Sequence, residues 1–227
     1  NMPTTLLSSC VADAGIAFCF APAHHPAMKY AGAVRKELGI PTVFNVLGPL
    51  SNPGQPAASL LGCADLRLAP VLAQVQLDRG FKSIIVRSTD GLDELSTSAP
   101  TQIWDVTSGQ LLEYTLTPQS LGLAPATIEQ LRGGDAIYNA QVVREIISGR
   151  SDGNFGAIRD VVALNAAATM VAYDAAKGAA RFGLVTDSVI DRIARALPVA
   201  YGALDTGAAS SLLDVWISVS QRFALRG

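Results

Sequence analysis

Short apolar runs bounded by Gly and Pro dominate the first half of the chain. They predict strands at residues 16–20, 59–63, 83–87, 103–106 and 111–116. The first run is expected to form a short buried strand that Pro22 ends. Ser108-Gly109 is expected to join the last two runs as a hairpin.

Helical periodicity accompanies these runs and takes over after Pro125. It predicts helices at residues 27–38, 69–78, 136–148, 158–176, 188–197 and 208–223. Strands that alternate with helices, followed by further packing helices, indicate an α/β fold with a mostly parallel central sheet flanked by helices. Gly133-Gly134-Asp135 is interpreted as the end of one helix and the cap of the next, rather than as a phosphate loop.

Composition narrows the class of protein. Of 227 residues, 49% are hydrophobic and 16% charged, enough for a large core in one or two domains. A net charge of −2 without a basic cluster gives no electrostatic footprint for nucleic acid. Three cysteines without metal-ligand spacing favour a reducing compartment. With no apolar run of membrane-spanning length, we expect a soluble, cytoplasmic protein.

A rigid, irregular loop is predicted at residues 44–53, Phe-Asn-Val-Leu-Gly-Pro-Leu-Ser-Asn-Pro. Gly48-Pro49 and Asn52-Pro53 place two prolines close together, and each proline fixes φ and restricts the residue before it. Such a loop after an apolar run would form a pocket wall in an α/β protein. The alternative is a Pro-rich connection without a binding role.

Neighbouring carboxylates follow the predicted strand at residues 83–87. Asp93 and Glu94 stand in the loop beyond its carboxyl end, the usual ligand edge of such a sheet. Mg²⁺ prefers one or two carboxylates together with substrate phosphates and waters. The pair is therefore a candidate magnesium site, and a solvated turn is the alternative.

The predicted helix at residues 27–38 carries one guanidinium on its apolar face. Arg35 shares that face with Met28, Ala31 and Leu38. Its guanidinium could extend into solvent while the aliphatic stem packs on the helix, or it could bind a carboxylate through two parallel N–H donors. His25, just before this helix, could cap it or line a pocket.

These segments together resemble one family. The matching motifs, in chain order, are Phe-Ala-Pro (20–22), His-His-Pro-Ala-Met-Lys (24–29), Val-Arg-Lys-Glu-Leu-Gly (34–39), the loop at 44–53, Asp-Gly-Leu-Asp-Glu-Leu-Ser (90–96), Gly-Gly-Asp-Ala (133–136) and Val-Ala-Leu-Asn-Ala-Ala (162–167). Their order and spacing resemble the anthranilate phosphoribosyltransferases of tryptophan biosynthesis, over essentially the whole chain.

The resemblance implies a reaction and its site residues. Anthranilate would displace pyrophosphate from 5-phosphoribosyl 1-diphosphate with the help of Mg²⁺. Asp93 and Glu94 match the family's magnesium-binding pair. Arg35 matches its anthranilate-contacting arginine, Gly48 and Pro49 match the loop that lines the anthranilate channel, and His25 matches a position near it. No nucleophilic Ser, Cys or His is required.

The resemblance also implies an architecture. The family has a nucleoside-phosphorylase-like α/β domain and a small helical domain, and it is usually dimeric. We therefore expect residues 1–23 and 43–227 to belong to the α/β domain, and residues 24–42 to form a hinge and helix of the helical domain. A homodimer is expected, without nucleic-acid or membrane partners.

The chain departs from the family pattern in two places. The upstream Gly-Thr-Gly-Gly-Asp, Asn-x-Ser-Thr and Lys-His-Gly-Asn motifs of the family do not occur, so we expect an incomplete site that is inactive by itself. Arg87-Ser88-Thr89 stands where relatives tend to have His-Gly. Two alternatives remain: a pyrimidine nucleoside phosphorylase of the same fold, and a non-catalytic relative that binds nucleic acid.

Overall fold

The computed structural model describes residues 4–24, 30, 32, 37–39, 48, 50–52 and 54–224. The chain divides into two compact units. Residues 1–53 and 207–227 form the smaller unit, and residues 54–206 form the larger one. The predicted domain boundaries at 23/24 and 42/43 fall in a stretch where few residues are described, so they stay a prediction.

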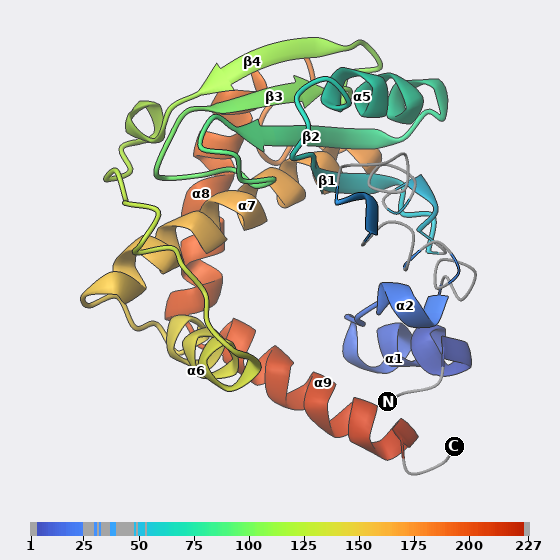
Figure 1. Ribbon diagram of the computed structural model, residues 1–227, viewed down its shortest axis with the longest axis vertical. Helices are drawn as coiled ribbons and strands as arrows, with labels where there is room; N and C mark the ends of the chain where they lie inside the picture. Colours follow the sequence, from blue (N-terminus) through green and yellow to red (C-terminus); the bar gives the residue numbers. More distant parts are fainter. Residues whose placement is uncertain are drawn as a thin grey trace. The chain divides into compact units, whose positions relative to one another are not determined.

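A four-stranded sheet forms the centre of the larger unit (Figure 1). Its strands are β1 (Ala58–Gly62), β2 (Lys82–Ser88), β3 (Thr101–Asp105) and β4 (Leu112–Leu116), and they lie in this order. β1 and β2 are parallel, with Ala58 opposite Lys82. β3 pairs with β2, and β4 with β3, in the antiparallel sense.

The α/β class is confirmed, but the described sheet is mixed rather than mostly parallel. Helix α5 (Ala69–Asp78) provides the crossover that a parallel β1–β2 pair requires. β3 and β4 are joined by the short turn predicted at Ser108-Gly109, and a hairpin makes antiparallel pairs. One parallel pair is therefore combined with two antiparallel ones.

The strand predicted at residues 16–20 is wrong. These residues have no regular secondary structure, and Phe18 is 66% exposed where a buried side chain was expected. A strand needs a neighbour for its backbone N–H and C=O groups, and no described strand pairs with this segment. The segment is apolar, as the prediction assumed, but no neighbouring strand that could pair with it is found among the described residues.

Helices cover both faces of the sheet. On one face α5 contributes Gln76, which accepts a hydrogen bond from Ser83 of β2 at 3.1 Å. On the other face, α7 (Asn154–Ala176) packs on β1 and β2, and α8 (Val189–Asp205) packs on α7. The central strand β2 is therefore largely buried, and Ile84 and Ile85 are both at 0% exposure on opposite faces.

Helix α7 also bears on the expectation of no membrane-spanning segment. Among the described helices, α7 is long and apolar enough to cross a membrane, although no unbroken apolar run marks it in the sequence. A core helix has the same length and composition, and Leu164, Ala167 and Val171 of α7 are buried in the unit. Its composition is therefore only a weak indication of a membrane segment.

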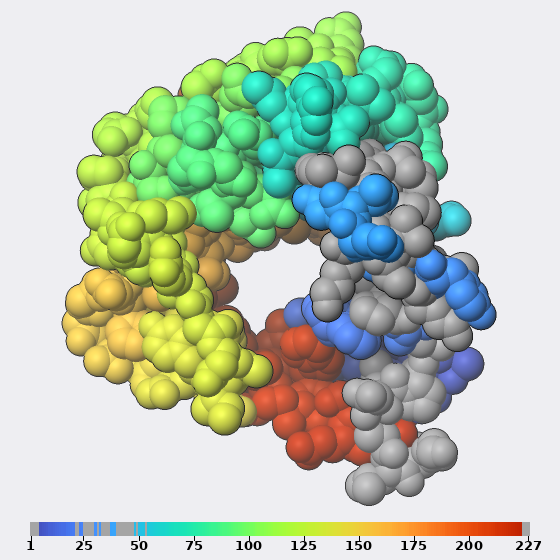
Figure 2. Space-filling view, in the orientation of Figure 1, coloured from blue at the N-terminus to red at the C-terminus, as the bar shows by residue number. Residues whose placement is uncertain are grey.

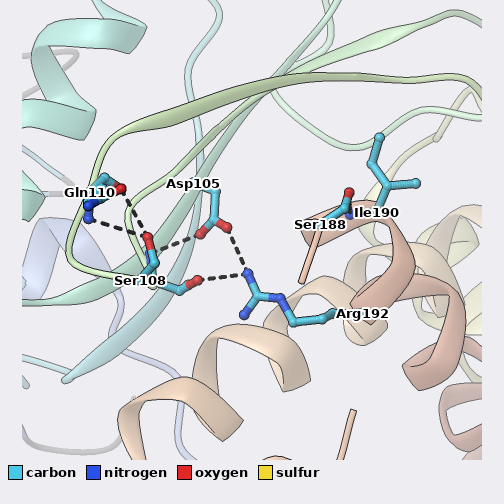
Figure 3. Close-up of polar contacts among 7 residues, drawn as sticks. Asp105, Ser108, Gln110, Ser188, Ile190 and Arg192 are labelled. Atoms are coloured by element: carbon cyan, nitrogen blue, oxygen red, sulfur yellow. Dashed lines mark hydrogen bonds and ion pairs between the residues drawn. The ribbon is translucent and has the colours of Figure 1, made fainter. Parts of the chain in front are cut away.

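A buried ion pair joins β3 to α8 (Figure 3). The Nη2 group of Arg192 donates to Asp105 Oδ2 at 2.7 Å and to Thr107 Oγ1 at 2.9 Å. Thr107 N–H donates to Asp105 Oδ1 at 2.9 Å, so both carboxylate oxygens have partners. Ser188 caps α8 by accepting from Ile190 N–H at 3.2 Å, and this fixes the helix that carries Arg192.

The remaining helices are short or peripheral. The larger unit also contains α6 (Ala136–Ile147) and the 3₁₀ helix η2 (Pro118–Leu121). The smaller unit contains η1 (Thr4–Leu6), α1 (Leu7–Ala14), α2 (Ala21–His24) and α9 (Ala208–Ala224). α1 and α9 pack through Cys10, Ala14, Val219 and Phe223, which are all buried.

Candidate functional site

The candidate site is the carboxylate loop, which we define as residues 88–98. It starts where β2 ends at Ser88 and leads to β3 at Thr101. Ser88 N–H donates to Leu92 O at 2.9 Å, and Gly91 turns the chain with a φ of 98° that favours glycine. In the space-filling view the green segment from β2 to β3 reaches the surface of the larger unit (Figure 2). The loop is thus a tight turn at the ligand edge of the sheet.

Asp90 organises this loop from within. Its Oδ1 accepts from Leu92 N–H at 3.1 Å, and its Oδ2 accepts from the hydroxyls of Ser96, at 2.9 Å, and Ser98. Partial burial opposes ionisation of Asp90, but these hydrogen bonds outweigh it and lower the pKa of its carboxyl. In the sequence, the only signal for this role is that serines follow Asp90 at positions 96 and 98. No role for Asp90 was predicted from it.

Asp93 and Glu94 lie exposed at the outer end of the loop. Glu94 is nevertheless surrounded closely enough that desolvation raises its pKa, and the negative charge of Asp93 raises it further. Two adjacent carboxylates that repel each other are stabilised by a cation between them. The position predicted for the pair, beyond the end of a parallel strand, agrees with the described fold.

Arg87 and Cys63 border the loop. The Arg87 side chain donates from Nε to Ala64 O at 3.1 Å and from Nη1 to Ser88 O at 3.2 Å, so it ties the end of β1 to the end of β2. Burial raises the pKa of the Cys63 thiol, and the charges of Asp65 and Asp93 add to this. Cys63 is therefore a protonated, inert thiol, and Arg87 has a structural role at this departure from the family pattern.

The predicted anthranilate residues are only partly described. Arg35, His25 and Pro49 lie outside the described residues. Gly48 belongs to the smaller unit, and its carbonyl accepts from Ser51 N–H at 3.2 Å and from Ser51 Oγ at 3.3 Å. Asp93 and Glu94 share one loop of the larger unit.

At Gly133-Gly134-Asp135 the predicted helix cap is confirmed, but the predicted helix end is wrong, because residues 128–131 form a turn and 132–134 have no regular structure. Asp135 is the N-cap of α6, and its Oδ1 accepts from Tyr138 N–H at 2.8 Å. Asn139 bonds both backbone groups of Gly134, each at 2.9 Å. The backbone N–H groups of Gly134 and Tyr138 are therefore bonded to side chains of the protein itself.

The donor set of the carboxylate loop fits a hard cation. Within the part of the chain that the structure describes, no cluster of three or more His, Cys, Asp or Glu side chains could hold a metal ion. Two neighbouring carboxylates alone are the arrangement that Mg²⁺ uses when substrate phosphates and waters complete its six ligands.

The fold and the loop define an α/β protein with acidic side chains at the carboxyl end of a parallel strand pair, the edge where such sheets usually bind ligands. The particular family follows from comparison with known proteins. A family model described as "Glycosyl transferase family, a/b domain" matches residues 1–210, and the chain belongs to this family.

Curated and solved relatives carry one common name. An anthranilate phosphoribosyltransferase of Nocardia farcinica is 44% identical over 220 residues, which are 97% of this chain and 62% of the relative. The crystal structure of anthranilate phosphoribosyltransferase from Thermus thermophilus superposes with a TM-score of 0.79 at 32% identity, covering 95% of this chain and 59% of that one.

The Saccharomyces cerevisiae enzyme of that name superposes as well. Its complex with 4-fluoroanthranilate gives a TM-score of 0.79 at 28% identity, over 96% of this chain and 59% of that one. Its complex with PRPP and Mg gives 0.77 at 27% identity, over 96% and 56%. The chain thus spans about 60% of the length of the relatives it matches.

Proposed function

We propose that the protein carrying this chain is an anthranilate phosphoribosyltransferase. It transfers the phosphoribosyl group of 5-phosphoribosyl 1-diphosphate to the amine of anthranilate and releases pyrophosphate, a step in tryptophan biosynthesis. The observation that carries the proposal is the Asp93–Glu94 pair, held on an ordered loop at the ligand edge of the sheet. Relatives of this name, 42–45% identical over most of the chain, support it.

The chemistry requires charge placement rather than a nucleophile. Loss of pyrophosphate leaves positive charge on the ribose and negative charge on the leaving group, so positioned charges lower the barrier. Asp93 and Glu94 would hold Mg²⁺, and the bound ion would neutralise negative charge on the diphosphate leaving group. Asp90 keeps the loop in one conformation through the three hydrogen bonds that its carboxylate accepts.

We assign the anthranilate side of the site to Arg35, Gly48, Pro49 and His25. The Arg35 guanidinium would bind the carboxylate of anthranilate through two parallel hydrogen bonds. Gly48 and Pro49 would line the channel, where the proline fixes the backbone. His25 would lie near its entrance. The relative solved with 4-fluoroanthranilate supports an anthranilate-shaped site in the family.

Further parts of the proposal rest on the same relatives. The cofactor is Mg²⁺, as in the yeast complex with PRPP and Mg. The full-length protein would be a cytoplasmic homodimer without nucleic-acid or membrane partners. Because the chain spans about 60% of its relatives, the rest of the diphosphate site would be supplied by residues outside this sequence.

The test replaces the acidic pair in the full-length protein. Asp93→Asn with Glu94→Gln should raise the Mg²⁺ concentration needed for half-maximal activity and lower kcat. Folding should remain intact, because both side chains are exposed. The loss of anthranilate fluorescence in the presence of PRPP measures the rate. Glu113→Gln, an exposed acid on β4, is the matched control.

Two results would contradict the proposal. One is a wild-type protein that consumes no anthranilate when PRPP and Mg²⁺ are present. The other is a double variant that matches the wild type at limiting Mg²⁺, because the pair would then be a solvated turn.

A further inference from the structure

Asn165, on α7, clamps the carboxylate loop at Leu95. Its Oδ1 accepts from Leu95 N–H at 3.0 Å, and its Nδ2 donates to Leu95 O at 2.8 Å. The same Nδ2 group donates to Val161 O at 2.9 Å within the helix. One amide thus joins two segments that are 70 residues apart in the sequence.

The clamp acts on the peptide next to the acidic pair. Leu95 N–H belongs to the planar peptide unit that it shares with Glu94. Fixing that unit from α7, with the Leu95 side chain at 0% exposure in the core, fixes the direction in which Glu94 leaves the backbone. The N–H and C=O of Leu95 are both bonded to Asn165, so the loop cannot rotate about this point without breaking two partly buried hydrogen bonds.

Gly62 supports the loop from the opposite side. It is the last residue of β1, and an added Cβ would lie 1.8 Å from the backbone oxygen of Asp93 and 3.0 Å from the Asp93 Cβ. No side chain fits there unless the Asp93 backbone moves. Glycine is therefore required for a close approach of two backbones rather than for its own conformation.

We propose that Asn165 and Gly62 are positioning residues that set the geometry of the Asp93–Glu94 pair for its cation. The proposal rests on the proposed function, which makes these carboxylates the metal ligands. Neither residue contacts the ligand, and both act on the backbone that carries it. Partners of this kind orient ligating side chains, and their loss costs about 10- to 100-fold in metal affinity.

The first experiment substitutes Asn165 in the full-length protein. Asn165→Ser keeps a hydroxyl that can bond Val161 O in the helix but cannot reach Leu95. Hydrogen exchange followed by mass spectrometry should show exchange at residues 92–97 accelerated about tenfold. A titration with Mn²⁺, followed by electron paramagnetic resonance, should show Kd raised about tenfold.

Asn139→Ala is the matched control, because Asn139 makes the same two bonds to Gly134 away from the loop. It should leave exchange of the carboxylate loop and the Mn²⁺ Kd unchanged. The KM for anthranilate should stay constant in both variants, since the effect is confined to the metal.

A second variant covers the case in which Asn165→Ser does not fold. Gly62→Ala adds one methyl group, pushes the Asp93 backbone away, and should weaken Mn²⁺ binding in the same direction. An unchanged Mn²⁺ Kd in a folded Asn165→Ser or Gly62→Ala variant would overturn the proposal. So would an equal loss in Asn139→Ala, which would indicate general destabilisation.

If the proposed function is wrong, these measurements should give a different set of results. If Asp93 and Glu94 are not metal ligands, their own replacement leaves Mn²⁺ binding unchanged, whereas the accelerated exchange in Asn165→Ser remains. A different result would overturn the positioning role alone. In that case, replacement of the acidic pair abolishes Mn²⁺ binding, but neither Asn165→Ser nor Gly62→Ala weakens it.

Discussion

Asp90 shows how one carboxylate of a loop can have a structural role while its neighbours are the proposed metal ligands. All three acids of the loop could be seen in the sequence, yet only Asp93 and Glu94 were predicted to act. The division of roles depends on the hydroxyls of Ser96 and Ser98, which the turn brings back to Asp90. Side-chain bonds that depend on a folded loop have no periodic signal in the sequence.

Asp90→Asn should lower stability in a pH-dependent way. The folded-state pKa of Asp90 lies below its ordinary value of about 3.9, so the ionised carboxylate stabilises the fold above that pH. This contribution is lost as the pH falls through the folded-state pKa. The thermal midpoint of Asp90→Asn should be lower than that of the wild type at pH 7, and the gap should close in acid. A gap that is constant down to pH 2 would contradict this origin.

Arg35→Ala tests the anthranilate side at the residue scale. Loss of a charge-assisted bidentate contact costs about 1.5–3 kcal/mol, and the KM for anthranilate should rise about 10- to 100-fold. The KM for PRPP should change little. Arg132→Ala, at an exposed arginine of the larger unit, is the control. An unchanged KM for anthranilate would mean that the Arg35 guanidinium only extends into solvent and does not bind anthranilate.

At the scale of elements, four of the five predicted strands lie within two residues of β1 to β4, and several helices were predicted as closely, whereas α1 was not predicted. The predicted helix at 69–78 has the same bounds as α5, and the predictions at 136–148 and 208–223 each end within one residue of α6 and α9. Helical periodicity and caps are local, so the sequence reports them directly. The strand predicted at 16–20 fails because strand formation depends on a distant partner.

Helix α8 was predicted too short for a different reason. The prediction ended at Leu197, directly before Pro198, and a proline inside a helix removes a backbone hydrogen bond. The structure continues through Pro198 to Asp205. Ala200 and Leu204 are each 5% exposed, and their burial outweighs the lost bond. Tertiary packing of this kind cannot be read from propensity alone.

The ion pair between β3 and α8 gives a prediction for stability. Arg192→Ala leaves the Asp105 carboxylate buried and without its cation, and the free energy of unfolding should fall by about 3–5 kcal/mol. Urea denaturation measures the loss. Asp105→Leu combined with Arg192→Met should recover most of it, because no charge is left buried.

Arg150→Ala provides the comparison. It breaks the exposed ion pairs that Arg150 makes with Asp152 and Glu145, and because water screens these pairs the loss of stability should be much smaller than for Arg192→Ala. Equal losses for Arg150→Ala and Arg192→Ala would refute a special role for the buried pair.

At the scale of the whole molecule, exposed apolar groups predict how the chain behaves by itself. In the smaller unit Phe18 and Phe20 are 66% and 55% exposed and their rings stack on each other, and in the larger unit the neighbours Ile137 and Tyr138 of α6 are 82% and 49% exposed. Exposed apolar surface of this kind promotes association. We expect the 227-residue chain to self-associate and to show no transferase activity, whereas the full-length protein should be active. Light scattering and the anthranilate assay test this; a monodisperse, active chain would contradict both expectations.

The pairing of α1 with α9 has a consequence for how the protein is made. Asp13 and Arg222, which are 209 positions apart, form an ion pair at 3.0 Å beside the buried Cys10–Phe223 cluster. On the ribosome, α1 cannot pair with α9 until all of residues 54–206 have been made. Residues 54–206 are continuous and can fold while synthesis proceeds, so of the two units the smaller one forms later and stays exposed to proteases and chaperones for longer when translation stalls.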